Sequence, residues 1–137
     1  QARYQKTISQ IFQEMGESEF RIIESNMLKE VGDFEDVVIS TGGGTPCFFD
    51  NMDYMNSVGT TIYLKATPED LSDRLNTCKD KRPLIKDKNK EELLAFVAEN
   101  LVKREPYYSK AIIIHEPGEL VNKDDVNKYI LQLIKKI

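Results

Sequence analysis

Three arginines and a run of three glycines are the residues of this sequence with the clearest chemical potential. A guanidinium binds a carboxylate or a phosphate through two parallel hydrogen bonds. A glycine run lacks side chains and reaches positive φ values easily, so a ligand can approach its backbone N–H groups. Together they predict a site for a small anionic substrate beside a polyphosphate donor. The residues are Arg21, Arg82, Arg104, Gly42, Gly43 and Gly44.

Each of these features also has a purely structural interpretation. Arg21 stands three residues before Glu24, which is the spacing of an ion pair on a helix surface. Arg104 is expected at a helix C-terminus, where a cation complements the helix dipole. Arg82 lies in a lysine-rich stretch that reads equally well as a solvated surface or as a lid over phosphates. Only the combination favours a binding site.

Several other kinds of site find little support in the sequence. Neither a Gly-x-Gly-x-x-Gly dinucleotide fingerprint nor a Gly-Lys-Ser/Thr phosphate loop is present. The single histidine, His115, ends a predicted strand, so Ser-His-Asp chemistry is not supported. Asp124 and Asp125 open a predicted helix and complement its dipole. Cys47 and Cys78 have neither metal-ligand spacing nor the density of a disulfide framework, which favours a cytoplasmic setting.

The elements that must position these residues alternate between helices and short apolar strands. Such alternation predicts an α/β fold with a parallel sheet between layers of helices, and ligands bound at the carboxyl ends of the strands. The glycine run directly follows one predicted strand, over residues 37–39. The expected order is helices 7–16 and 17–31, strand 37–39, helix 50–58, strand 60–65, a helix after Thr67, a basic loop 79–90, a helix from Asn89 to Arg104, strand 111–115 and a helix after Asn122.

Composition is that of one ordinary globular domain of 137 residues. Apolar residues make up 40% and charged residues 31%, which argues against disorder. The longest apolar runs are too short to span a membrane. The formal net charge of −4 argues against nucleic acid as a partner. We therefore expect a small-molecule ligand and no nucleic-acid or membrane partner.

Four segments, taken together, resemble the shikimate kinases, which are nucleoside monophosphate kinase-like P-loop kinases. The first is Phe20-Arg21 with Glu24, preceded by a helix that ends at Gly16, and the second is the stretch 38–44 through the glycines. The others are Arg82-Pro83-Leu84 and the run 103–108, Lys-Arg-Glu-Pro-Tyr-Tyr. The similarity covers the whole chain in order. It implies the three-layer α/β/α fold of P-loop kinases and one domain, with substrate-binding helices in residues 1–32 and a lid in residues 79–90.

The resemblance implies roles in binding the substrate. Arg21 and Arg104 correspond to the two arginines that hold the carboxylate of shikimate. Gly43, flanked by Gly42 and Gly44, corresponds to the glycine whose backbone meets the ring hydroxyls. The implied reaction transfers the γ-phosphoryl group of ATP to the 3-hydroxyl of shikimate, a step of aromatic amino-acid biosynthesis. A cytoplasmic monomer is implied as well.

The resemblance also implies roles beside the nucleotide. Arg82 corresponds to a catalytic lid arginine that reaches the ATP phosphates, and Arg74 to an arginine beside the adenine. Ser40 stands near the expected Mg²⁺, which it would meet through a water molecule. The family's P-loop and its Asp-x-Asp segment have no counterpart here, and we expect them upstream of Gln1. Without them this chain is expected to be inactive and poorly stable alone.

Two other functions remain open from the sequence. One is a kinase of the same fold for another small metabolite, such as a gluconate-type kinase. Two carboxylate-binding arginines disfavour it, because a substrate without a carboxylate has less use for them. The other is a non-catalytic binding module that never had a P-loop. The three-strand sheet predicted here disfavours that alternative, because parallel sheets need cover on both faces.

Overall fold

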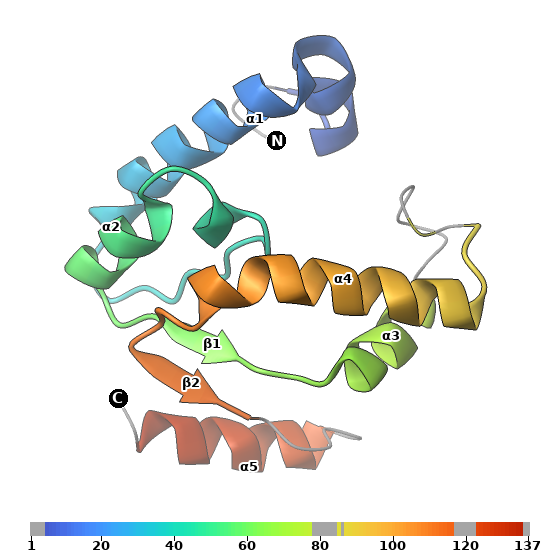
Figure 1. The fold of residues 1–137 in the computed structure, drawn as a ribbon. Coiled ribbons are helices and arrows are strands. Elements are labelled where there is room, and N and C mark those ends of the chain that lie inside the picture. The colour runs from blue at the N-terminus through green and yellow to red at the C-terminus, as the bar shows by residue number, and fades with distance from the viewer. Residues whose placement is uncertain (1–4, 78–84, 86, 117–122, 136–137) are drawn as a thin grey trace. The chain divides into compact units, whose positions relative to one another are not determined.

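The computed structural model describes residues 5–77, 85, 87–116 and 123–135. The chain divides into two compact units, Gln1–Gly59 and Thr60–Ile137, which are described separately below. Figure 1 shows their helices and strands. None of the helices in the described ranges combines the length and the apolar character that crossing a bilayer requires.

The first unit is dominated by helix α1, Ile8–Gly32, which is broken once. Thr7 caps its start, and Gln10 closes a reciprocal capping box with it, as the sequence predicts. Gly16 has φ 79° and ψ 173°, so it separates two helical segments. Glycine adopts this left-handed region without the steric cost that other residues meet. The prediction of two successive helices divided at Gly16 is therefore confirmed.

A short 3₁₀ turn and a helix complete the first unit. The turn η1 is Thr45–Cys47, and helix α2 is Asn51–Val58, close to the predicted helix 50–58. The Tyr54 hydroxyl donates to the Lys29 carbonyl at 3.1 Å, which ties α2 to the end of α1. A side chain at Gly32 would collide with that tyrosine, because a Cβ there would lie 2.4 Å from the Tyr54 oxygen.

The predicted strand over residues 37–39 is wrong for this structure. Val38 is fully exposed, Val37 and Ile39 are about half exposed, and the segment is irregular. A strand requires a neighbour that completes its backbone hydrogen bonds, and no described segment pairs with this one. The apolar, β-branched pattern predicted burial, but a pattern cannot supply the pairing partner.

The second unit contains a pair of parallel strands, β1 (Ile62–Leu64) and β2 (Ile113–His115). Ile62 pairs with Ile113, and Leu64 pairs with His115, whose side chain is buried. Parallel pairing of segments about fifty residues apart requires a crossover, and α3 and α4 form it. These strands lie inside the predicted strands 60–65 and 111–115, so both predictions are confirmed.

The second unit also contains three helices: α3 (Pro68–Asn76), α4 (Lys90–Tyr108) and α5 (Lys123–Ile134). In Figure 1, α4 and α5 lie on opposite sides of the strand pair. Thr67 caps α3 and Asn89 caps α4, both as predicted. Ile85, Leu93 and Val97 form the buried core of this unit, with Leu71, Leu75 and Phe96 packed against it.

Two helix predictions need correction. Helix α4 was expected to end near Arg104, yet it continues through Pro106 to Tyr108. Proline removes one backbone donor, but tertiary contacts hold this last turn, since the rings of Tyr63 and Tyr108 pack 5.1 Å apart. In α5, the helical spacing of Val126, Ile130 and Ile134 predicts an apolar stripe that packs inward, yet these residues are 37%, 44% and 60% exposed. Their helical spacing was correct, but periodicity does not show what covers a stripe.

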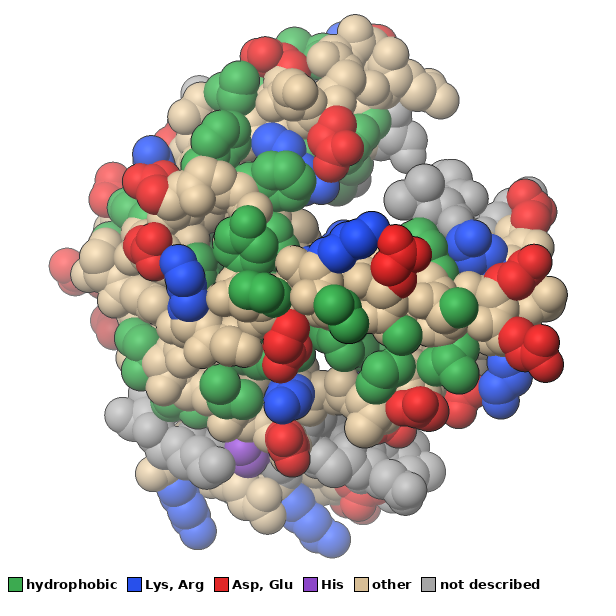
Figure 2. All heavy atoms as spheres, viewed as in Figure 1, with side chains coloured by type: hydrophobic (Ala, Val, Ile, Leu, Met, Phe, Trp, Pro, Cys, Tyr) green, Lys and Arg blue, Asp and Glu red, His purple; other side chains and the backbone are tan. Residues whose placement is uncertain are grey.

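Figure 2 shows hydrophobic side chains scattered across the visible surface of the molecule.

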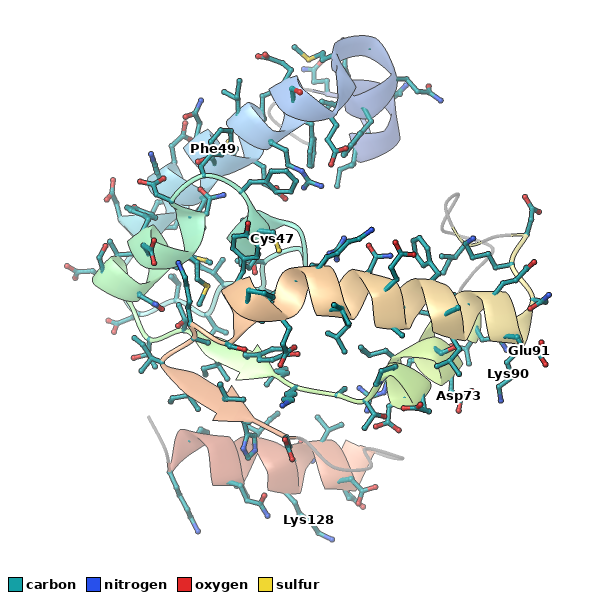
Figure 3. All side chains as sticks on the ribbon, in the orientation of Figure 1. Cys47, Phe49, Asp73, Lys90, Glu91 and Lys128 are labelled. Carbon is teal, nitrogen blue, oxygen red and sulfur yellow. The ribbon has the colours of Figure 1, made fainter. Side chains whose placement is uncertain are left out.

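The basic loop predicted over residues 79–90 is described only at its end. Residues 79–84 and 86 lie outside the described residues, and Cys78 does too. Ile85 is buried against Leu93, and Lys90 already belongs to α4. Lys90 pairs with Asp73 of α3 at 3.2 Å (Figure 3).

Candidate active site

Arg21 lies on the second segment of α1, one turn after the break at Gly16. Its Nη1 donates to Glu24 at 2.9 Å, and its Nη2 donates to Glu17 at 3.0 Å. The Phe48 ring centroid lies 4.2 Å from the guanidinium carbon, close enough for a cation–π contact. The side chain is only 14% exposed. Helix spacing and an aromatic stack therefore fix this cation in place.

The glycine run packs directly against this arginine. A Cβ at Gly44 would lie 2.7 Å from Arg21 Nη1, closer than real Cβ atoms approach other groups. Gly42 has more room, because a Cβ there would meet Thr45 Oγ1 at 3.6 Å and Glu24 Oε1 at 3.7 Å. The structure thus brings Arg21 and the glycine run together within one unit.

The expected positive φ values of this run are not found. Among the described glycines only Gly16 has one. Gly44 has φ −82°, which any residue can adopt. The loop is instead a tight turn, in which Thr45 N–H donates to the Gly42 carbonyl at 3.0 Å and Cys47 N–H donates to the Gly44 carbonyl at 2.9 Å. At Gly44 the absence of a side chain makes room for the guanidinium.

Cys47 supports the middle glycine. Its thiol donates a weak hydrogen bond to the Gly43 carbonyl oxygen, with 3.7 Å between Sγ and the oxygen. Figure 3 labels Cys47 in the turn that follows the glycines. The Cys47 side chain is half-buried.

Glu24 and Thr45 join the arginine to the glycine turn. Glu24 Oε2 accepts from Arg21, and its Oε1 accepts from the Thr45 hydroxyl at 2.8 Å. Thr45 is buried, so this bond is shielded from water. The ion pair expected as the plain structural alternative for Arg21 therefore exists. It orients the guanidinium beside the loop and does not by itself exclude a binding role.

Asn51 forms a second connection between α1 and the turn. It is completely buried, its Oδ1 accepts from the Ser25 hydroxyl at 2.7 Å, and its Nδ2 donates to the Thr45 carbonyl at 2.9 Å. The sequence analysis missed Thr45, Asn51 and Phe48. An asparagine at a predicted helix start signals only a cap, and its long-range partners are invisible in the sequence.

Asn51→Ala is expected to lower the free energy of unfolding of the protein by about 1–3 kcal/mol, because two buried polar groups lose their partner. Denaturant unfolding measures the loss. The matched control is Asn26→Ala, at an exposed asparagine of α1, which should leave the unfolding free energy nearly unchanged. Equal stability of the two variants would contradict a structural role for Asn51.

Arg104 lies in the second unit, on α4. The helix continues to Tyr108, so Arg104 is not at the C-terminus and the last turn contains no basic residue. The structural alternative for this residue, compensation of the helix dipole, is therefore less well supported. The side chain is half-buried. Among the described residues the structure gives it no ion pair.

The carboxylate next to Arg104 is engaged elsewhere. Glu105 accepts from the Tyr63 hydroxyl at 2.8 Å and lies 3.7 Å from Lys65 Nζ. The pKa of the Tyr63 hydroxyl is raised above its ordinary value, first because burial disfavours the phenolate and then because the Glu105 carboxylate holds its proton. These contacts tie the end of α4 to β1 and so hold the backbone on which Arg104 stands.

The remaining predicted site residues occupy different surroundings. Ser40 is exposed on the irregular segment before the glycines. Arg74 is exposed in the last turn of α3, where it complements the helix dipole. Arg82 lies outside the described residues. No group of three or more potential metal-ligating side chains occurs within the ranges that the structure covers.

Comparison with known proteins identifies the family of the chain. The family model described as shikimate kinase matches residues 1–135. Curated relatives include the shikimate kinase of Parabacteroides distasonis, 53% identical over 98% of this chain and 78% of that protein. That of Bacteroides fragilis is 49% identical over 97% of this chain and 74% of that protein. This chain thus spans about three quarters of the length of these relatives.

Solved structures give the same answer. The crystal structure of shikimate kinase from Bacteroides thetaiotaomicron matches with a TM-score of 0.93 and 42% identity, over 98% of this chain and 76% of that one. Shikimate kinase from Acinetobacter baumannii in complex with shikimate matches with a TM-score of 0.78 and 30% identity, over 98% and 73% of the two chains.

These neighbours establish the class: the chain has the three-layer α/β/α fold of the P-loop kinases, as predicted. Within that class, the chain belongs to the shikimate kinase family. It is an enzyme of aromatic amino-acid biosynthesis, and its reaction is the ATP-dependent phosphorylation of shikimate. The sequence-based predictions of family and enzymatic function are thereby confirmed.

Proposed function

We propose that Arg21 and Arg104 bind the carboxylate of shikimate, and that Gly42, Gly43 and Gly44 present backbone groups to its ring hydroxyls. The observation that carries the proposal is the packing of the Arg21 guanidinium against Gly44, where a Cβ would lie 2.7 Å away. A cation and an exposed run of backbone so close together suit a small hydroxylated acid. The solved relative in complex with shikimate supports this choice of ligand.

The reaction that fits these roles is transfer to the 3-hydroxyl of shikimate. The hydroxyl oxygen forms a bond to the γ-phosphorus as the bond to the β,γ-bridging oxygen breaks, and the hydroxyl proton is lost. Such transfer depends chiefly on positioning and on stabilisation of charge. In this proposal Arg21 and Arg104 fix the acid, the catalytic Arg82 reaches the ATP phosphates, and Arg74 lies beside the adenine.

Mg²⁺ accompanies ATP in the proposed reaction, where it would neutralise charge on the phosphates. Magnesium prefers one or two carboxylates, substrate phosphates and several waters. Among the described residues Ser40 offers one exposed, neutral hydroxyl with no cluster of acidic ligands around it. Ser40 therefore suits a hydrogen bond to a magnesium-bound water rather than direct ligation.

We further propose how the protein is organised and where it works. Residues 1–137 form a single shikimate kinase-like domain, in which residues 1–32 are the substrate-binding helices and residues 79–90 the lid. The protein acts as a monomer in the cytoplasm, where reducing conditions suit a chain with two cysteines and no disulfide framework. Its net charge of −4 suits small-molecule ligands and argues against nucleic-acid or membrane partners.

Gly44→Ala tests the packing of arginine against loop. The backbone of Gly44 accepts alanine, but the new Cβ must displace the guanidinium, and overpacking of this kind costs about 1–3 kcal/mol. We expect the KM for shikimate in the complete enzyme to rise several-fold, with a smaller change in the KM for ATP. Steady-state kinetics with each substrate varied in turn measures both values.

A double-mutant cycle with Arg21→Ala identifies the cause of the effect. If Gly44→Ala acts by moving Arg21, it should add little once Arg21 is absent. Fully additive effects of the two substitutions would show that the alanine disturbs something else, and would remove the main support for the proposed shikimate site.

A further inference from the structure

Arg21 is surrounded by two carboxylates of its own helix, and they differ in how firmly they are held. The Glu24 side chain is 18% exposed and has its second oxygen fixed by Thr45. The Glu17 side chain is 61% exposed. Among the described residues, Glu17 has no hydrogen bond or ion pair other than its pair with Arg21. Of the two, Glu17 is the one that can leave.

The three nitrogens of the guanidinium have different surroundings. Its Nε is buried without a hydrogen-bond partner among the described residues, and its Nη1 faces Glu24 and Gly44. Phe48 covers one face of the group at 4.2 Å. Nη2 bonds instead to the exposed Glu17 side chain.

Charge adds to this argument. One guanidinium with two carboxylates already carries an excess of one negative charge. A third carboxylate, from a substrate, would be repelled unless one of the others moved away. An exposed i,i+4 ion pair is weak, so releasing Glu17 into water costs little. Glu17 directly follows the break at Gly16 and stands at the start of a helical segment, where the dipole still favours its charge.

We infer that Glu17 occupies, in the free enzyme, the place of the substrate carboxylate on Arg21 Nη2, and that shikimate binds by displacing it. Glu17 is then an internal competitor that sets the affinity for acidic substrates. This inference rests on the proposed role of Arg21 in binding the carboxylate.

The test compares the binding of shikimate and of its methyl ester to the complete enzyme by calorimetry. Glu17→Gln removes the competing charge and should tighten shikimate binding about two- to fivefold. It should leave the ester unaffected, because a ligand without a carboxylate does not need to displace Glu17. Glu19→Gln removes the same charge at a neighbouring exposed position and should change neither affinity.

Arg21→Ala separates failure of this inference from failure of the proposed function. If Arg21→Ala weakens shikimate but not the ester, Arg21 binds the carboxylate. In that case, unchanged or weaker shikimate binding by Glu17→Gln overturns the inference alone, and so does equal tightening of both ligands. If Arg21→Ala affects both ligands equally, the proposed role of Arg21 fails and the inference fails with it.

Discussion

Replacing Arg21 with alanine should reduce kcat/KM for shikimate by about 2–5 kcal/mol of transition-state stabilisation in the complete enzyme. The guanidinium is only 14% exposed and is held by Glu24 and an aromatic ring, so its geometry is set before the substrate arrives. Its loss removes a charge-assisted contact and leaves Glu24 without its cation. Steady-state kinetics with shikimate varied at saturating ATP measures the change.

Arg21→Lys is the matched control for charge alone. Lysine keeps the positive charge but cannot form two parallel bonds to a carboxylate or lie flat on Phe48. Most of the loss should therefore persist in this variant. Full activity with lysine would mean that charge suffices, and unchanged kinetics with alanine would contradict any contact between Arg21 and the substrate.

A loss of similar size, about 2–5 kcal/mol in kcat/KM, is expected for Arg104→Ala. Arg104 is half-buried, it is not at the end of its helix, and no described carboxylate neutralises it. A half-buried cation without a described carboxylate partner is suited to binding an anionic ligand. The free energy of unfolding should change much less than kcat/KM, since Arg104 forms no ion pair with a described residue.

Lys103→Ala is the control for Arg104→Ala. Lys103 is the preceding residue, its side chain is exposed, and it pairs with Glu99 on the helix surface. Removing it should leave shikimate kinetics nearly unchanged, because exposed pairs contribute little. Comparable losses from both substitutions would point to a general effect of charge on this helix and would contradict a specific role for Arg104.

Local signals in the sequence predicted much of the fold. Thr7, Thr67 and Asn89 cap helices as expected, because a cap depends on residues three positions apart. Features that depend on distant partners were predicted less well. The segment 37–39 has the composition of a strand but no partner among the described residues, and Pro106 lies inside a helix that tertiary contacts extend.

The residues of the candidate site show the same difference between local sequence signals and contacts with distant partners. Residue type and spacing pointed to Arg21 and the glycine run, and the structure brings them together. The sequence could not show that Gly44 makes room for the guanidinium, or that Thr45 and Asn51 bind Glu24 and Ser25 of α1. Those contacts join residues more than twenty positions apart or depend on burial. Convergence of Arg104 and Arg82 on the same site stays a prediction.

The break at Gly16 makes the rotational orientation of the second segment of α1 independent of the length of the first segment. In an unbroken helix, a residue gained or lost in the first turns would rotate everything after it by roughly 100°. Here a residue gained or lost before Gly16 would alter only the first segment and its contact between Phe12 and Phe20. Arg21 would keep its direction, because Glu24, Thr45 and the glycine turn fix the second segment independently. Length variation upstream of Gly16 is thereby made tolerable without turning the arginine away from its ligand.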